Sequence, residues 1–128
     1  MKDIEKLELL KAVLAVAAAD GNLKRSEMAV AEGLAARVGV GQASFDAMVN
    51  AAQRGDTSAA SIVMQSNESA CKALELLVGE ARIDGEIHEA ERELLVRIAG
   101  RLKITGDSFQ AIYKAGIDRA DRIRKRRS

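Results

Sequence analysis

Two copies of a short acidic motif are the residues best suited to chemistry in this chain of 128 residues. Each copy reads Asp-Gly-x-(Leu or Ile)-x-x-x-Glu. The first runs from Asp20 to Glu27 and the second from Asp84 to Glu91. Carboxylate oxygens are the ligands that hard divalent cations prefer, and an Asp before an invariant Gly with a closing Glu is typical of the second half of an EF-hand loop. The motif therefore indicates either a cation site or a turn between two helices.

The first half of the EF-hand pattern is missing from both copies. An EF-hand needs oxygen ligands four and two residues before that Asp. The first copy has Val16 and Ala18 at these places, and the second has Glu80 and Arg82, so a cation stands where a ligand belongs. We do not expect an EF-type calcium loop in either copy.

A purely structural role explains most of the same motif. Gly supplies the left-handed backbone that ends a helix, and a Glu near the third position of the next helix faces unpaired backbone amides and the positive end of the helix dipole. Glu27 and Glu91 have this position. The preferred cap positions hold Lys24 and His88, which are poor N-caps, so the capping box is incomplete in both copies.

The motif belongs to an internal repeat with a period of 64 residues. Over positions 9–49, ten residues are identical to those 64 positions later, in 73–113, without a gap. A repeat of this kind predicts two halves, related by a pseudo-twofold axis, that bury their apolar faces against each other. If that axis brings the two motifs together, four carboxylates could hold one divalent cation in a composite site, namely Asp20, Glu27, Asp84 and Glu91.

Apolar residues recur every three or four positions along nearly the whole chain, and alternating patterns typical of strands are missing. We therefore predict an all-α, single-domain bundle of six or seven helices. The predicted helices cover about 3–19 and 25–38, a third capped by Ser44, a short one opened by Thr57 or Ser58, one capped by Asn67 and ending near Arg82, one through Leu94 to Leu102, and one from Thr105 or Gly106.

The duplicated motif and its flanks resemble the tellurite-resistance protein B (TerB) family. The resemblance rests on Ala17-x-Ala19-Asp20-Gly21-x-Leu23-x-x-x-Glu27 with the helix that ends in Arg37-Val38-Gly39-Val40, and on the second copy from Ala81-x-x-Asp84-Gly85 through Leu102-Lys103-Ile104. It covers about residues 5–116. We therefore divide the chain into a TerB-like domain over 1–116 and a basic tail over 117–128.

The resemblance implies a bundle of about seven helices and a non-enzymatic part in bacterial tellurite resistance and related stress responses. It also implies that acidic residues bind a divalent cation, which by position would be Asp20, Glu27, Asp84 and Glu91. Many family members have Asp or Ser where this chain has Lys24 and His88, so the charge beside each acidic pair is less negative here. Partners would be proteins of a stress-response assembly.

Residues for enzymatic chemistry are scarce. The chain has one His and one Cys, no Trp and no Pro. Cys71 lies on a predicted apolar stripe, which favours a core thiol over a nucleophile, and His88 is expected to face solvent near a helix start. Zinc ligands of the Cys and His type are missing, and Gly39-Val40-Gly41 lacks the Lys and Ser or Thr of a phosphate loop. We predict that the protein is not an enzyme.

The basic tail is the remaining feature with a charge of its own. Residues 117–128 contain six Lys or Arg and two Asp, whereas the rest of the chain contains 14 bases and 17 acids. A terminal basic run is typical of a solvated, disordered end, but it could also contact anionic lipid or nucleic acid. With two Phe and one Tyr, base stacking and hence nucleic-acid binding is not favoured. The longest apolar run, 12–19, is too short to span a membrane, so we expect a cytoplasmic protein, with a possible peripheral association at the inner membrane face.

Overall fold

The structure is a computed structural model that describes residues 3–19, 21, 23–55, 62–83 and 85–127. Within these residues the chain forms six helices and no strand, as the apolar spacing predicts. In chain order the helices are α1 (Asp3–Ala18), α2 (Arg25–Val38), α3 (Gln42–Gln53), α4 (Asn67–Ala81), α5 (Glu89–Arg101) and α6 (Gly106–Arg127).

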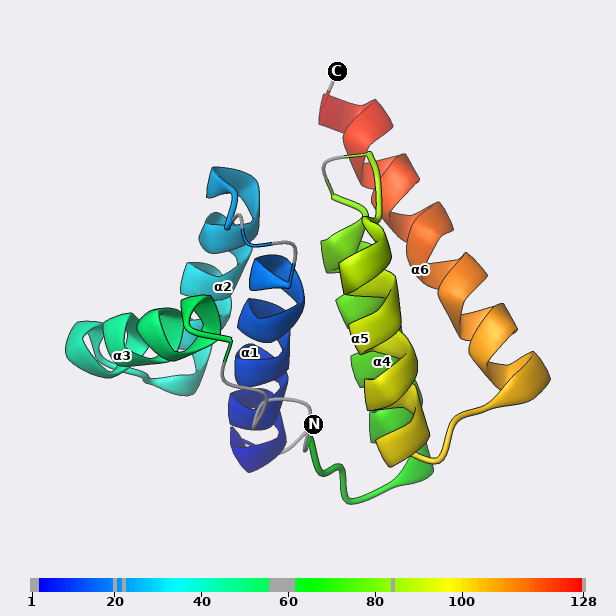
Figure 1. Ribbon diagram of the computed structural model, residues 1–128, viewed down its shortest axis with the longest axis horizontal. Coiled ribbons are helices and arrows are strands. Elements are labelled where there is room, and N and C mark those ends of the chain that lie inside the picture. Colours follow the sequence, from blue (N-terminus) through cyan, green and yellow to red (C-terminus); the bar gives the residue numbers. More distant parts are fainter. Residues whose placement is uncertain (1–2, 20, 22, 56–61, 84, 128) are drawn as a thin grey trace.

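The helix positions repeat with the period of the sequence. The helices α4, α5 and α6 each begin 64 residues after α1, α2 and α3 respectively, so the bundle has a first half (α1–α3) and a second half (α4–α6). Figure 1 shows α1 beside the α4–α5 pair, with α2 and α3 on one flank and α6 on the other. The halves meet mainly where α1 contacts α4 and α5, so these helices form the centre of the bundle.

The core is aliphatic and is supplied by both halves. Helix α1 carries apolar residues on all its faces and is buried over most of its length, as expected for a helix surrounded by others. The two phenylalanines occupy equivalent places at the edge of the core, Phe45 on α3 and Phe109 on α6. The largest fully buried aliphatic side chains come from α1, α4 and α5, and are Leu10, Leu14, Val16, Leu74, Leu77, Val78, Leu95 and Ile98.

Two of the predicted helix caps are wrong. Helix α4 is capped by Ser66, whose Oγ accepts a hydrogen bond from the Ser69 backbone N–H (3.1 Å), and Asn67 is the first helical residue. Helix α3 begins two residues before Ser44, because the Gly41 backbone is extended and its carbonyl already accepts from the Phe45 N–H (2.9 Å). The helix predicted over 25–38 has those bounds, and the start of a short helix predicted at Thr57 or Ser58 lies outside the described residues.

The basic tail is helical, so the expectation of a disordered end is wrong for residues 117–127. Helix α6 continues through this segment to Arg127, and Ala120 is completely buried. The helix packs closely on α4, because a Cβ built at Gly116 would lie 2.7 Å from the Val78 Cβ. In the part of the chain that is described, no helix combines the length and apolar character needed to cross a membrane.

Candidate acidic site at the helix ends

Glu27 and Glu91 close the first turn of α2 and of α5 in the same way. The Glu27 Oε1 accepts a hydrogen bond from the Lys24 backbone N–H (3.1 Å), and the Glu91 Oε1 accepts one from the His88 N–H (3.0 Å). Each carboxylate thereby satisfies a backbone donor at a positive helix end. Neither the Lys24 nor the His88 side chain makes a cap hydrogen bond. In each motif, the half of the capping box that is present is therefore the bond from the Glu carboxylate.

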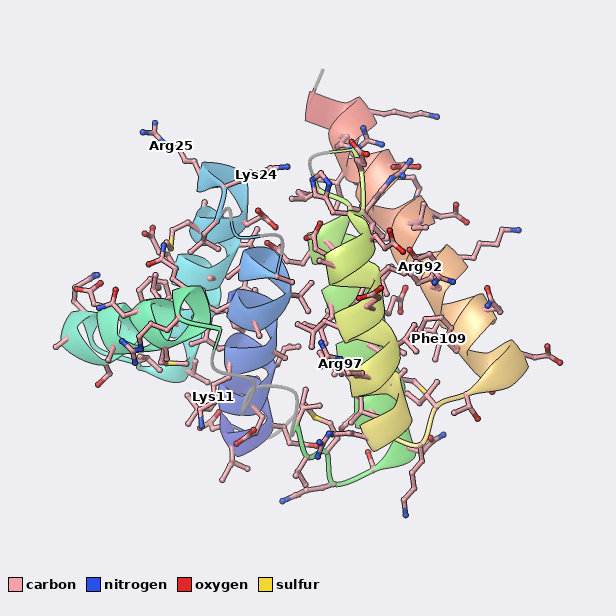
Figure 2. All side chains as sticks on the ribbon, viewed as in Figure 1. Lys11, Lys24, Arg25, Arg92, Arg97 and Phe109 are labelled. Carbon is pink, nitrogen blue, oxygen red and sulfur yellow. The ribbon has the colours of Figure 1, made fainter. Side chains whose placement is uncertain are left out.

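The two motifs meet across the boundary between the halves. The Lys24 Nζ lies 3.4 Å from the Nε2 of His88, its equivalent 64 residues later. Figure 2 shows Lys24 extending from the start of α2 toward the second half, whereas Arg25 points away from it. An ammonium group can only donate, so Nε2 of a neutral His88 accepts this hydrogen bond. Contact between equivalent residues is what a pseudo-twofold axis near these helix starts produces. His88 is half-buried, not solvent-facing as expected.

A third carboxyl, that of Glu80 in the last turn of α4, faces the same region. Glu80 is 6 % exposed, and its Oε1 has no hydrogen-bond partner. Burial raises the pKa of Glu80 to about 8, with further contributions from the negative charges of Glu27 and then Glu91. The Glu80 carboxyl therefore holds its proton at neutral pH. We call Glu27, Glu80 and Glu91 the acidic site.

The acidic site satisfies part of what a composite cation site requires. The chemistry of hard oxygen donors fits a divalent cation, and Glu27 and Glu91 act on the same Glu80 carboxyl. Among the described residues, however, no group of three or more His, Cys, Asp or Glu side chains is arranged to hold a metal ion. Asp20 and Asp84 lie outside the described residues, so the complete set of four carboxylates stays a prediction.

Glu80 is the member of the acidic site that sequence reasoning did not select. It stands four residues before Asp84, at the place of the first EF-hand ligand, and it is the equivalent of Val16 in the first half. The useful signal was a lone acidic residue in the apolar stretch from Leu76 to Ala81, at a position where the repeat has a buried Val. A carboxyl in such a stretch is either exposed or functional.

An ion pair connects the tail to the end of α4, just before the second motif. The Arg82 Nε, just after α4, lies 3.2 Å from the Asp121 Oδ1, and Arg124 also donates to Asp121. The Arg124 guanidinium passes directly over Gly85, where a Cβ would lie 2.9 Å from its Nη1. Gly85 is favoured by its φ of +100°, whereas the guanidinium at the end of the flexible Arg124 side chain could move away from a Cβ.

Cys71 lies in the second turn of α4 and is half-buried against the core. Its Sγ is 4.0 Å from the Asn67 Oδ1. The thiol is therefore at the edge of the core, which partly matches the predicted core position.

Comparison with known proteins assigns no relative to this fold and site. No protein-family model matches the chain, and neither a curated protein nor a solved structure gives a match.

Proposed function

We propose that the chain is a non-enzymatic, TerB-like helical module that takes part in tellurite resistance or a related stress response by binding partner proteins. We further propose that a composite site of Asp20, Glu27, Asp84 and Glu91 binds a divalent cation. The contact between Lys24 and His88 carries this proposal, because it places the two copies of the acidic motif against each other. The repeated helix starts provide the scaffold that a duplicated motif of this kind requires.

The carboxylates that would hold the cation come from both motifs. Glu27 and Glu91 each present one carboxylate at a helix start, and a carboxylate that accepts one backbone N–H has capacity for further contacts. Asp20 and Asp84 would complete the set. The cation would also favour the ionised form of Glu80, because its charge opposes the repulsion from Glu27 and Glu91.

A titration followed by amide-resolved NMR tests the cation. Calcium, magnesium, manganese and zinc are added in turn to the wild type and to the variants Glu27→Gln and Glu91→Gln. We expect saturable changes confined to residues 20–27 and 84–91, as shifts or, with manganese, as broadening, and a loss of affinity of about tenfold or more in either variant.

The matched controls are Glu32→Gln on α2 and Glu93→Gln on α5, which remove an exposed carboxylate from the same helices. Both should bind as the wild type does. If the amides of 20–27 and 84–91 do not respond at millimolar metal, or if the controls lose as much affinity as the site variants, the cation proposal is wrong.

Co-purification from the native host tests the protein partners. Tagged wild type and the Glu27→Gln/Glu91→Gln double variant are recovered from cells with and without tellurite, and the retained proteins are identified by mass spectrometry. We expect a defined set of partners that the wild type retains and the double variant loses. If both proteins retain the same partners, partner binding does not depend on the acidic site. If the wild type retains no partner, the interaction role is wrong.

A further inference from the structure

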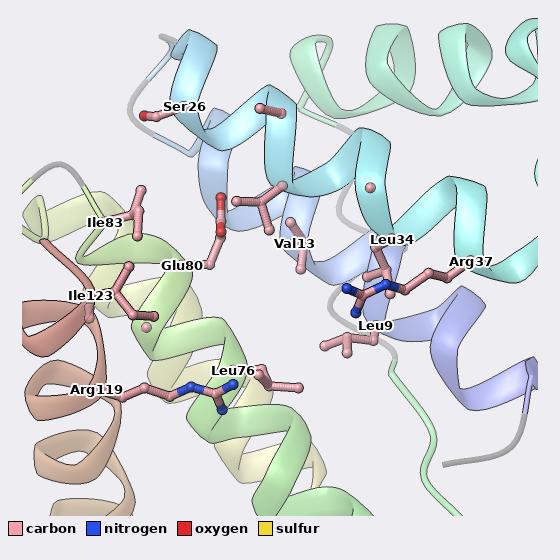
Figure 3. Close-up of a pocket in the computed structure, with 15 residues that line it drawn as sticks. Leu9, Val13, Ser26, Leu34, Arg37, Leu76, Glu80, Ile83, Arg119 and Ile123 are labelled. Carbon is pink, nitrogen blue, oxygen red and sulfur yellow. The ribbon is translucent and has the colours of Figure 1, made fainter. Parts of the chain in front are cut away.

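A cavity separates the two halves on the side where α2 faces α4 and α6. Its volume is about 530 Å³, within the range of about 300–1,000 Å³ of small-molecule sites. Figure 3 shows it open between these helices, with α1 behind. Its walls are mainly aliphatic and include no aromatic residue, and among the residues that line it are Leu9, Leu34, Leu76, Ile83 and Ile123.

Four polar side chains line this apolar space, namely Ser26, Arg37, Glu80 and Arg119, and the last three carry ionisable groups. Glu80 lines one part of the cavity, and its buried Oε1 has no hydrogen-bond partner. Arg37 on α2 and Arg119 on α6 line another part, and Figure 3 shows their guanidinium groups directed toward each other from opposite walls. Within the described residues, neither arginine has an ion-pair partner. Both arginines are exposed at the rim of the cavity, and an anion between them can accept charge-assisted hydrogen bonds from both guanidinium groups.

We propose that this cavity binds a small amphipathic anion, an aliphatic chain with a carboxylate or phosphate head and a hydroxyl group toward its other end. The head lies between Arg37 and Arg119, because guanidinium groups bind both anions through paired N–H donors. The chain buries apolar surface against the aliphatic walls, and the hydroxyl donates to the Glu80 Oε1. This site goes beyond the cation proposal, since Glu27 and Glu91 do not line the cavity.

Filling the cavity is the most direct test. Gly33 lines it from α2, has no atom within 4 Å of a built Cβ and has no positive φ, so Gly33→Leu places a side chain there without backbone strain. Gly100→Leu on α5 is the matched control, because Gly100 is equally open and lies outside the cavity. Decanoate below its micelle concentration is titrated into each protein by calorimetry. We expect saturable binding to the wild type and to Gly100→Leu, and none to Gly33→Leu.

The arginines are tested with the same probe and with two related ones. Arg37→Gln and Arg119→Gln should each weaken decanoate by about tenfold, while Arg97→Gln, an exposed arginine of α5 outside the cavity, should not. Decyl phosphate should bind as decanoate does, and neutral decanol should bind at least tenfold more weakly. Equal binding of decanol and decanoate, or unchanged affinity in both cavity arginine variants, would overturn the assignment of the anionic head.

Glu80 is tested by comparing decanoate with 10-hydroxydecanoate. We expect the hydroxylated acid to bind the wild type several-fold more tightly, and the preference to disappear in Glu80→Leu. Equal affinity for the two acids in the wild type would overturn the Glu80 contact.

The same anionic head occurs on free acids and on membrane lipids. Vesicles of phosphatidylglycerol that displace decanoate from the wild type would identify a lipid as the source, and vesicles that leave it bound would identify a free acid. If decanoate does not bind saturably, or binds Gly33→Leu as well as the wild type, the site itself is disproved.

Discussion

The two halves of the bundle share their helix positions, and three of the equivalent places at which their residues differ are informative. Position 16 in the first half is a completely buried Val, whereas its equivalent is Glu80, a buried carboxyl. Gly39 ends α2 with a φ of +77°, whereas Lys103 has the equivalent left-handed backbone with a φ of +62°. The third difference is an Ala at position 52 of the first half and Gly116 in the second half, where α6 presses on α4.

These differences assign different roles to the two halves. The first half has favourable residues at both places, an apolar Val16 in the core and a glycine, Gly39, in the left-handed region. The second half has an unpartnered buried carboxyl and a non-glycine residue in the left-handed region. Both are unfavourable for folding, and residues of this kind concentrate at functional positions. Glu80 belongs to the acidic site and to the cavity wall, so it takes part in both regions for which we propose binding.

The largest expected effect comes from making the first half like the second at position 16. Val16→Glu places a carboxyl without a partner in the centre of the core, and we expect it to lower the free energy of unfolding by about 4 kcal/mol. Urea denaturation followed by circular dichroism measures it. The matched control is Val96→Glu on the exposed face of α5, where we expect a change of about 0.5 kcal/mol or less. A loss below about 1 kcal/mol for Val16→Glu would show that both halves accept a carboxyl at this position.

The second effect is a pH dependence of the free energy of unfolding that arises from Glu80 and has no counterpart at Val16. The pKa of Glu80 rises from its ordinary value of 4.5 to about 8, so the folded state holds a proton there that the unfolded state has released. The free energy of unfolding therefore falls as the pH rises through this window, and the contribution is lost above pH 8. We expect the wild type to lose about 4 kcal/mol between pH 5 and pH 9 relative to Glu80→Gln, which cannot ionise.

Urea denaturation at a series of pH values measures this difference. Glu93→Gln serves as control, because Glu93 is an exposed carboxylate on α5 and its removal should leave the pH profile unchanged. If wild type and Glu80→Gln have parallel profiles, Glu80 does not hold its proton in the folded state.

The third effect concerns the packing of α6 on α4. Gly116→Ala brings a methyl group to 2.7 Å from the Val78 Cβ and 2.9 Å from the Glu75 backbone oxygen, so the helices must separate. We expect a loss of about 2 kcal/mol in thermal or urea unfolding, despite the better helix propensity of Ala. Gly100→Ala, with open space around it, should instead gain about 0.5–1 kcal/mol. Stabilisation by both variants would mean that the interface of α6 with α4 has room for a methyl group at Gly116.

The smallest effect exchanges the backbone preference at the ends of α2 and α5. Lys103→Gly removes the side chain from a residue with left-handed backbone, where a Cβ is unfavourable. We expect it to raise the free energy of unfolding by about 1 kcal/mol. The reverse change at the equivalent place, Gly39→Lys, should lower it by about the same amount. Differential scanning calorimetry of both variants checks the pair. Equal signs for the two changes would show that the backbone conformation is not what distinguishes these positions.

Much of the fold could be predicted from the sequence because helix formation follows local patterns. The spacing of apolar residues gives the bounds 25–38 for α2 without error, and the 64-residue repeat anticipates the equal spacing of the helix starts. The caps were harder to predict. Both Ser66 and Asn67 can cap α4, and the choice depends on which hydroxyl or amide reaches the Ser69 N–H once the chain enters from the preceding segment.

The candidate site was predicted only in part for a different reason. Glu27 and Glu91 are named by their motif, and their hydrogen bonds to Lys24 and His88 are local. The only local sign of Glu80 is its place in an apolar stretch, and its raised pKa depends on burial and on carboxylates from two other helices. For the tail, a frayed helix was one interpretation of the sequence, but a disordered end was favoured. The helix depends on the burial of Ala120 and on the contact of Asp121 with Arg82, which are tertiary features.

By itself, the sequence determined the all-helical class, the duplication and the chemical type of the repeated motif, because periodicity and residue identity act over a few positions. Tertiary structure alone decided three things: the approach of Lys24 to His88, the burial of the Glu80 carboxyl and the cavity between α2, α4 and α6. Each of these depends on how two halves that are far apart in the chain pack together, and the free energies of burial and of charge interaction arise only in that packed arrangement.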